Sequence, residues 1–449
     1  MVRGRISRLS VRDVRFPTSL GGHGSDAMVS AVTGASCGAD FQAHVGAGHT
    51  DPDYSAAYVV LETDAEDGLQ GYGLTFTLGK GTEVVVCAVN ALAHHVLHKD
   101  LRDIVGDFRG FYRQLTSDGQ LRWIGPEKGV VHLATAAVLN AVWDLWAKQE
   151  GKPLWKLLVD MDPRTLLSCI DFRYITDVLT EEEAYEILQK GQVGKKEREG
   201  QMLMHGYPAY TTSCAWLGYS DDTLKQLCTE ALKDGWTRFK VKVGADLQDD
   251  IRRCRLIRNM IGPEKTLMMD ANQRWDVPEA IEWMSKLAEF KPLWIEEPTS
   301  PDDILGHAAI SKCHNRVIFK QLLQAKALQF LQIDSCRLGS VNENLSVLLM
   351  AKKFEIPVCP HAGGVGLCEL VQHLIIFDFI SVSASLKNRM CEYVDHLHEH
   401  FRYPVIIKKA SYMPPKDAGY STEMKEESIK KHQYPDGEVW KKLLAAQEN

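Results

Sequence analysis

The sequence lacks three features that would each assign it to a different class of protein. Its eleven cysteines are scattered over 449 residues without one CxxC pair, so neither a zinc ribbon nor a disulfide framework is predicted, and we expect a reducing compartment. No uninterrupted run of 18 apolar residues occurs, so the sequence predicts no membrane span. Lys and Arg number 52 against 59 Asp and Glu, a net charge of −7, which argues against nucleic acid as the partner.

What is present is the composition of an ordinary globular protein that is too long for one core. The sequence is 45% hydrophobic, 25% charged and 8% aromatic. We predict an α+β domain over residues 1–160, a helical connector over 161–207 and a barrel over 208–395. The last segment, 396–449, is predicted to return to the first domain.

A change of periodicity predicts the architecture of the first domain. Residues 5–16, 56–62 and 71–76 are β-rich runs separated by turn signals, and they predict a three-stranded antiparallel meander. From 81 to 159 the apolar residues recur at helical spacing. A sheet that is followed by helices indicates an α+β domain.

Two segments near the N-terminus stand apart from this pattern. Residues 1–16 are rich in Arg with Asp13 as the single acid, which is the composition of an organellar transit peptide as well as of an edge strand. Residues 29–48 contain nine Ala or Gly and a single charge, Asp40. With no apolar period, that stretch is predicted to be a flexible insertion.

In the second half of the chain, short β-rich runs alternate with amphipathic helical windows. This alternation predicts parallel strands, and seven or eight such units predict a TIM-type barrel whose chemistry lies at the C-terminal ends of the strands. The predicted strands are YTTSCAW, RFKVKVG, LMMDANQRW, LWIEEP, LQFLQIDSC, IPVCPHAGG and ISVSASL.

Polar residues recur at these predicted strand ends. Lys240 and Lys242 lie two apart and therefore on the same side of one strand, and two buried ammonium groups require carboxylates or a bound anion beside them. The other strand-end residues are Asp270, Asn272, Glu296, Glu297, Asp334, His361 and Glu392. Residues at the ends of successive strands are 26 to 31 positions apart, the length of one βα unit, except between Glu296 and Asp334.

These motifs resemble the enolase superfamily in its mandelate racemase branch. The resemblance extends over almost the whole chain through WDLWAKQEGKPLWKLL, the KxK strand, MDAN, IEEP, QID and PHAGG. Within the branch, SLGGHGSDAM and DPDYSAAYVVLETD are similar to the L-fuconate dehydratases. The resemblance implies a capping α+β domain on a modified TIM barrel of (β/α)7β type.

The family's residue roles transfer position by position onto matching residues. The resemblance implies that Asp270 and Glu296 are ligands of Mg²⁺, that Lys242 is the base on one side of the substrate, and that Asp334 and His361 form the catalytic dyad on the other. It also implies a set of substrate-binding residues, namely Gly24, Ser25, Asp26, Tyr54, Lys240, Asn272, His361 and Glu392.

The implied reaction is the removal of a C2 proton and loss of the C3 hydroxyl, which converts L-fuconate to 2-keto-3-deoxy-L-fuconate in L-fucose catabolism. The expected partner is a small acid sugar, with a homo-oligomer as a further expectation. The expected location is the mitochondrion, with the cytoplasm as the alternative. Two other functions stay open: a racemase or dehydratase of another aldonate, and a catalytically silent variant with a binding or regulatory role.

The sequence departs from the family between Glu296 and Asp334, which are 38 residues apart. Two βα units at the local spacing need about 52 to 54 residues, so the fifth barrel strand is predicted to be damaged or absent. That strand carries the family's third metal-binding carboxylate, which is therefore predicted to be missing. Glu297 is predicted to be a poor replacement, because alternation along a strand sends it to the opposite face from Glu296.

Overall fold

The computed structural model describes residues 2–21, 53–125, 129–300, 302–310 and 316–447. The first domain contains a three-stranded antiparallel sheet in the order β1 (Ile6–Arg15), β2 (Ser55–Thr63) and β3 (Gln70–Thr77). The predicted meander is therefore confirmed. The insertion at 29–48 lies outside the described residues.

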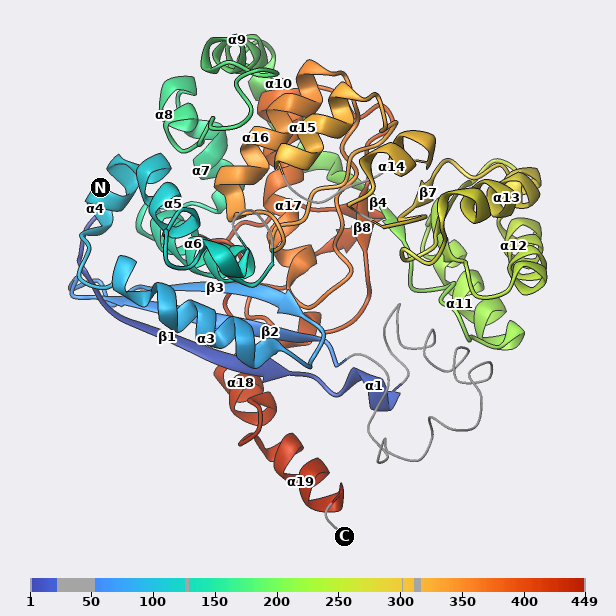
Figure 1. Cartoon of the computed structure of the whole chain (residues 1–449), viewed down its shortest axis with the longest axis horizontal. Coiled ribbons are helices and arrows are strands. Elements are labelled where there is room, and N and C mark those ends of the chain that lie inside the picture. Colours follow the sequence, from blue (N-terminus) through green and yellow to red (C-terminus); the bar gives the residue numbers. More distant parts are fainter. Residues whose placement is uncertain (1, 22–52, 126–128, 301, 311–315, 448–449) are drawn as a thin grey trace.

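Two helices, α3 (Thr82–Leu92) and α6 (Val130–Gln149), pack against this sheet (Figure 1). The contact between β3 and α6 depends on glycine, because a Cβ built on Gly73 would lie 2.1 Å from the Ala137 carbonyl oxygen. In the described part of the chain, α6 is the one helix that is long and apolar enough to cross a membrane. Its most apolar window is 89% buried inside the protein, which is typical of a core helix.

Short helices surround this core and lead to the barrel. In the first domain they are α1 (Thr18–Gly21), η1 (Ala93–His95), α4 (Leu101–Gly106), α5 (Phe108–Thr116) and η2 (Arg122–Ile124). The connecting region contains α7 (Leu154–Asp160), α8 (Pro163–Ser168), α9 (Glu181–Gly191) and α10 (Lys195–His205). A capping box between Thr180 and Glu183 fixes the start of α9.

Parallel strands and helices then alternate, as predicted, and the predicted arrangement of a capping domain on a barrel is confirmed. The barrel strands are β4 (Tyr207–Thr211), β5 (Arg238–Lys242), β6 (Thr266–Asp270), β7 (Ile295–Glu296) and β8 (Cys391–Tyr393). The barrel helices are α11 (Asp221–Lys233), α12 (Leu247–Ile261), α13 (Val277–Leu287), η3 (Ala288–Phe290), α14 (Ile304–Ile310), α15 (Arg316–Gln324), α16 (Ser340–Lys353), α17 (Leu367–Phe377) and η4 (Asp378–Ser383).

Three of the seven predicted strands are not formed. LQFLQIDSC and IPVCPHAGG meet only in an isolated bridge between Leu331 and Val358, and ISVSASL is mostly helical. Most of ISVSASL forms the end of η4, a π-helical segment that directly continues α17. The segment is buried and packs against α9, α10 and α16. Burial on all sides selects apolar and β-branched residues as a buried strand does, so tertiary packing overrides the local β propensity.

The region of the expected fifth strand differs from the rest of the barrel. Among the described residues between β7 and Leu331 there are helices and no strand. The segment around Leu331 forms a parallel bridge with Val358, but in the described residues no backbone hydrogen bond joins it to β7. Side chains connect the two instead, with the Trp294 and Phe330 ring centroids 5.0 Å apart.

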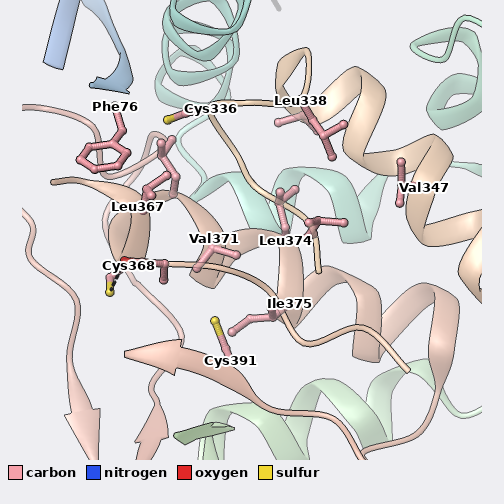
Figure 2. Close-up of a cluster of buried hydrophobic side chains, with 14 of the residues drawn as sticks. Phe76, Cys336, Leu338, Val347, Leu367, Cys368, Val371, Leu374, Ile375 and Cys391 are labelled. Carbon is pink, nitrogen blue, oxygen red and sulfur yellow. Dashed lines mark hydrogen bonds between the residues drawn. The ribbon is translucent and has the colours of Figure 1, made fainter. Parts of the chain in front are cut away.

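The barrel and the capping domain share one hydrophobic core. Figure 2 shows Phe76 from β3 above α17, with Cys391 from β8 on the other side of that helix. After β8 the chain forms η5 (His398–His400), β9 (Ile407–Lys408), β10 (Ser411–Tyr412), α18 (Glu426–His432) and α19 (Glu438–Gln447). The indole of Trp440 donates to the Arg15 carbonyl, so α19 is attached to the end of β1.

A buried ion pair in this last segment predicts a pH-dependent stability. The Nδ1 atom of His398 lies 2.7 Å from the Glu369 carboxylate. Burial disfavours the charged imidazolium, but Glu369 outweighs it and raises the pKa of His398 from 6.5 to about 9. A raised pKa means that the folded state holds the proton more tightly, so the stabilisation is complete below pH 6.5 and disappears as the pH rises through 9.

We expect the wild type to lose on the order of 3 kcal/mol of unfolding free energy from this pair between about pH 6.5 and 9. Urea titrations across that range, run in parallel on His398→Gln, measure the effect, since glutamine cannot be protonated. If the unfolding free energy depended on pH in the same way in both proteins, the His398–Glu369 pair would not be the cause.

Candidate active site

The C-terminal ends of β5, β6 and β7 place three charged residues level with one another, and a fourth lies two residues earlier on β5. Lys242 pairs in register with Asp270, and Asp270 with Glu296. The ammonium of Lys242 lies 2.8 Å from an Asp270 oxygen. Lys240, two residues earlier on the same face of β5, lies 3.2 Å from Asp270 and 3.0 Å from Glu296.

Glu392 on β8 completes this charged cluster from the other side of β4. Its carboxylate lies 2.6 Å from the Lys240 ammonium, which therefore contacts three carboxylates while only 1% exposed. Burial opposes the charge on Lys240, but Glu296 and Glu392 hold its pKa well above the ordinary value. The structure thus supplies the carboxylates that two buried lysines require.

The predicted dyad is also assembled. His361 Nδ1 lies 2.9 Å from Asp334 Oδ2, and His361 Nε2 lies 3.8 Å from Glu392. Asp334 accepts further hydrogen bonds from the backbone N–H groups of Cys336 and Arg337. Burial opposes ionisation of Asp334, yet the His361 hydrogen bond keeps its pKa below the ordinary value. The same bond, against the effect of burial, raises the pKa of His361.

A buried arginine fixes the strand ends that carry these residues. The guanidinium of Arg253 on α12 donates to the carbonyls of Lys242, Ala215 and Trp216 at 2.8, 3.1 and 2.9 Å. It therefore ties the end of β5 to the loop that follows β4. A planar group with five donors suits this task, because several carbonyls converge on one side chain.

The prediction that Glu297 faces away from Glu296 is wrong. Glu297 lines the same cavity as Glu296, because its φ of 44° lies in the left-handed region and breaks the alternation of the strand. Asn272 and Gln273, with φ of 47° and 62°, follow β6 in the same conformation. Backbone strain of this kind persists only where surrounding structure imposes it, and it concentrates at functional sites.

A cavity of about 250 Å³ opens at these strand ends. Eight of the residues expected there surround it or support it: Lys240, Lys242, Asp270, Asn272, Glu296, Glu392 and His361 line it, and Asp334 stands behind His361. Tyr54 does not line it. Tyr54 is buried and packs edge-on against Phe76, which does line the cavity. Gly24, Ser25 and Asp26 lie outside the described residues.

Sequence reasoning missed several residues of the cavity wall. Gln273 and Arg337 line it, and both directly follow motifs that had been singled out, DAN and QIDSC. Phe76, Leu78 and Thr212 also line it, from the end of β3 and the loop after β4. Nothing in the local sequence distinguishes Phe76 and Leu78, because only the packing of the capping domain brings them to the barrel. Thr212 directly follows β4, inside the predicted strand YTTSCAW, and is a strand-end residue that was not singled out.

The donor atoms around Asp270 and Glu296 fit a hard cation such as Mg²⁺. Both side chains are carboxylates, each 2% exposed, on neighbouring strands. In addition, the structure shows no hydrogen-bond partner for the buried side-chain oxygen of Asn272 among the residues that it describes. Oxygen donors of this kind are those that Mg²⁺ prefers. Glu296 also accepts a 3.0 Å hydrogen bond from Gln332, which follows the region of the expected fifth strand.

A second buried cluster holds the loop that carries the dyad. Glu343 on α16 lies 2.5 Å from His132 of α6 and accepts from the backbone N–H of Gly339, at 2.5 Å, and of Arg316, at 3.2 Å. Burial opposes its ionisation, but His132 brings the pKa of Glu343 down to about 2. The capping domain and the Asp334–Gly339 loop are thereby joined at one carboxylate.

We expect Glu343→Gln to lower the unfolding free energy by about 3 kcal/mol, near the lower end of the loss caused by breaking a buried ion pair. Urea denaturation at neutral pH measures the difference. The matched control is Glu355→Gln, which alters an exposed glutamate just beyond the same helix. Equal losses of unfolding free energy in the two variants would show that Glu343 does not stabilise the contact between the capping domain and the Asp334–Gly339 loop.

Comparison with protein-family models identifies both domains. The mandelate racemase / muconate lactonizing enzyme N-terminal domain matches residues 46–159, and the enolase C-terminal domain-like family matches residues 223–428. These matches and the architecture agree with the family resemblance of the sequence motifs.

Among known proteins, the chain is 85% identical to mitochondrial enolase superfamily member 1 of Homo sapiens, over 100% of both chains. A crystal structure of that human protein superposes with a TM-score of 0.93 over 99% of each chain. The chain is also 50% identical to L-galactonate dehydratase of Hypocrea jecorina, over 96% of this chain and 94% of the relative.

Similarity of fold extends further. L-talarate/galactarate dehydratase of Salmonella typhimurium, crystallised with Mg and L-lyxarohydroxamate, superposes with a TM-score of 0.69. It is 22% identical, and the match covers 95% of this chain and 92% of that one. The capping domain and barrel described above are thus a fold shared with magnesium-binding acid-sugar dehydratases.

Proposed function

Because this chain belongs to the enolase superfamily, we propose that it is built for the Mg²⁺-dependent dehydration of an acid sugar, with L-fuconate as the substrate. The observation that carries the proposal is the meeting of Lys242 and the His361–Asp334 pair at one cavity beside two buried carboxylates. A base, an acid and a site for a hard cation are the groups that removal of a C2 proton and a β-hydroxyl requires.

The charges of the site support this substrate class. Three carboxylates, Asp270, Glu296 and Glu392, surround the two ammonium groups of Lys240 and Lys242. The group carries one excess negative charge, which a divalent cation and a singly charged carboxylate substrate together neutralise. A neutral or cationic substrate would leave buried charge uncompensated, at a large cost in free energy.

Each polar residue then has one task. Asp270 and Glu296 would hold Mg²⁺, which supplies electrostatic stabilisation of the substrate carboxylate as negative charge develops on it. Lys242 takes the proton from C2 after its ammonium has first released its own proton to solvent, and Lys240 holds Glu392 and Glu296 in place. His361, oriented by Asp334, donates a proton to the C3 hydroxyl as it departs as water. The resulting enol tautomerises to a 2-keto-3-deoxy acid.

The choice of L-fuconate rests on resemblance and on stereochemistry. L-Fuconate is the 6-deoxy form of L-galactonate, which is the substrate named for the fungal relative at 50% identity. The two acids share their configuration at every reacting carbon and differ only by the C6 hydroxyl. L-Galactonate dehydration is therefore the main alternative, and racemisation of an aldonate, which needs only proton transfer at C2, is another.

The region between β7 and Leu331 supports a second candidate, a form of the protein with little activity. In the described residues this region provides no acidic side chain to the cavity after Glu297. The alignment with the human relative runs over 463 positions, more than the 449 residues of this chain. That relative therefore has residues without a counterpart here. We propose that loss of the fifth strand and its carboxylate weakens Mg²⁺ binding.

A direct test uses two proteins. One is this chain, and the other, the restored form, replaces residues 297–333 with the corresponding segment of the human relative. Each is incubated with Mg²⁺ and with L-fuconate, L-galactonate, D-galactonate and galactarate in turn, and the 2-keto acid is measured. We expect the restored form to use L-fuconate best. Faster turnover of any other acid, or racemisation without a keto acid, would contradict the substrate assignment.

The cellular setting is also a proposal. The human relative is named as mitochondrial, and together with the Arg-rich N-terminal segment this supports a mitochondrial protein. Fractionation of cells that express the chain with a C-terminal tag tests it, with the cytoplasm as the contradicting outcome. A homo-oligomer stays a prediction.

A further inference from the structure

A cluster of metal-ligating side chains lies in the capping domain, apart from the active site. His94 and His95 form the end of η1, which follows α3, and Asp118 lies in the turn after α5. One ligand atom from each residue lies within 4.8 Å of the others. None of the three residues lines the cavity at the barrel strands.

Hydrogen bonds outside the cluster already orient two of these side chains. His94 Nδ1 lies 2.9 Å from the Ala91 carbonyl, so this nitrogen carries the proton and Nε2 keeps its lone pair for a ligand. Asp118 Oδ1 accepts from the backbone N–H of Gln120 at 2.8 Å, which leaves Oδ2 directed at the two imidazoles. Supporting contacts of this kind, from a carbonyl and a backbone N–H, are those that fix histidine and carboxylate ligands in metal sites.

The distances fit a small tetrahedral ion. Asp118 Oδ2 lies 2.9 Å from His95 Nε2 and 3.8 Å from His94 Nε2. Two ligands at about 2.0–2.1 Å from a tetrahedral Zn²⁺ are about 3.3 Å apart, between the two values observed. A shift of a few tenths of an ångström brings these two contacts to the tetrahedral spacing, and the ligand atoms of His94 and His95 lie within 4.8 Å of each other. Such shifts cost little here, because the His94 side chain is 61% exposed.

We propose that His94, His95 and Asp118 form a zinc site with one open position. Two imidazoles and one carboxylate suit Zn²⁺ and disfavour Mg²⁺, which requires oxygen donors in octahedral arrangement. The ion replaces the hydrogen bond between His95 and Asp118. It cross-links the end of α3 to the end of α5, two segments that are over 20 residues apart in sequence. The proposal does not depend on the reaction at the barrel.

Calorimetric titration of the full chain with Zn²⁺, in excess Mg²⁺ to occupy the barrel site, tests this proposal. The exposed thiol of Cys87 is first replaced in a Cys87→Ser background, because it is a competing zinc ligand. We expect one tight site, and a loss in affinity of at least about 10–100-fold in His95→Ala and in Asp118→Asn, since removal of a residue that only supports a ligand already costs that much. The matched control is His98→Ala, an exposed histidine three residues further on.

Two further measurements separate the site from a fortuitous effect on folding. Zn²⁺ should raise the thermal midpoint of the background protein and of His98→Ala, and should leave that of His95→Ala unchanged. Co²⁺ bound in place of Zn²⁺ should show a tetrahedral visible spectrum without thiolate charge transfer. Equal zinc affinity in His95→Ala, Asp118→Asn and His98→Ala would overturn the proposal, and so would a cobalt spectrum with thiolate bands.

Discussion

Replacing Lys242 or His361 by alanine in the restored form should lower the rate of L-fuconate dehydration by about 10²–10⁴-fold, the usual contribution of a general acid or base. We assign removal of the C2 proton to Lys242 and not to Lys240, because Lys240 contacts three carboxylates and stays cationic. His361 is directed by Asp334 at 2.9 Å. Removal of either group leaves the cavity without a partner for one of the two proton transfers.

The two variants should differ in a second measurement, the exchange of the C2 proton with deuterated solvent. His361→Ala keeps the base, so exchange should continue while water loss stops. Lys242→Ala should lose both.

Asp334→Asn should lower the rate of dehydration and also shift its pH profile, because the carboxylate raises the pKa of His361 against the effect of burial. Lys233→Ala, on the exposed end of α11, is the control for a change of charge. Normal turnover in either alanine variant would show that the assignment of Lys242 as the base and His361 as the acid is wrong.

The second large effect concerns Mg²⁺. We expect this chain to bind Mg²⁺ at least about tenfold more weakly than the restored form, because loss of a residue that merely supports a ligand has that effect at the least. Asp270 and Glu296 remain, but Mg²⁺ requires near-octahedral placement of its ligands, which two carboxylates fix poorly. In the absence of the ion, Lys240 binds both of these carboxylates and competes for them.

Calorimetric Mg²⁺ titrations, thermal midpoints and release of keto acid, measured on both forms side by side, provide the comparison. The restored form should also unfold at a higher temperature, because among the described residues no backbone hydrogen bond joins β7 to the next barrel segment, and such strand edges lack partners. Equal affinity and equal turnover in the two forms would mean that another group replaces the third carboxylate, whose loss we propose. Glu297 is then the first residue to substitute, since it lines the cavity beside Glu296. Glu297→Gln would lower the affinity in this chain alone.

The sequence by itself predicted the parts of this protein that depend on local periodicity and on strand register. Side chains alternate along a strand, and one βα unit separates each strand end from the next, so Lys242, Asp270 and Glu296 had to meet at one level of the barrel. The observed register of β5, β6 and β7 agrees with this. The interval between Glu296 and Asp334 likewise indicated a region without room for a full βα unit.

Only the tertiary structure decided the features that depend on packing between distant segments. Glu297 turns into the cavity through a left-handed backbone conformation, and ISVSASL is helical because helices enclose it on several sides. The joining of α6 to the dyad loop through Glu343 depends on two residues 211 positions apart. His95 and Asp118 are 23 positions apart. Local propensity extends over a few residues, whereas these contacts form only once whole elements have packed, and no short sequence pattern encodes them.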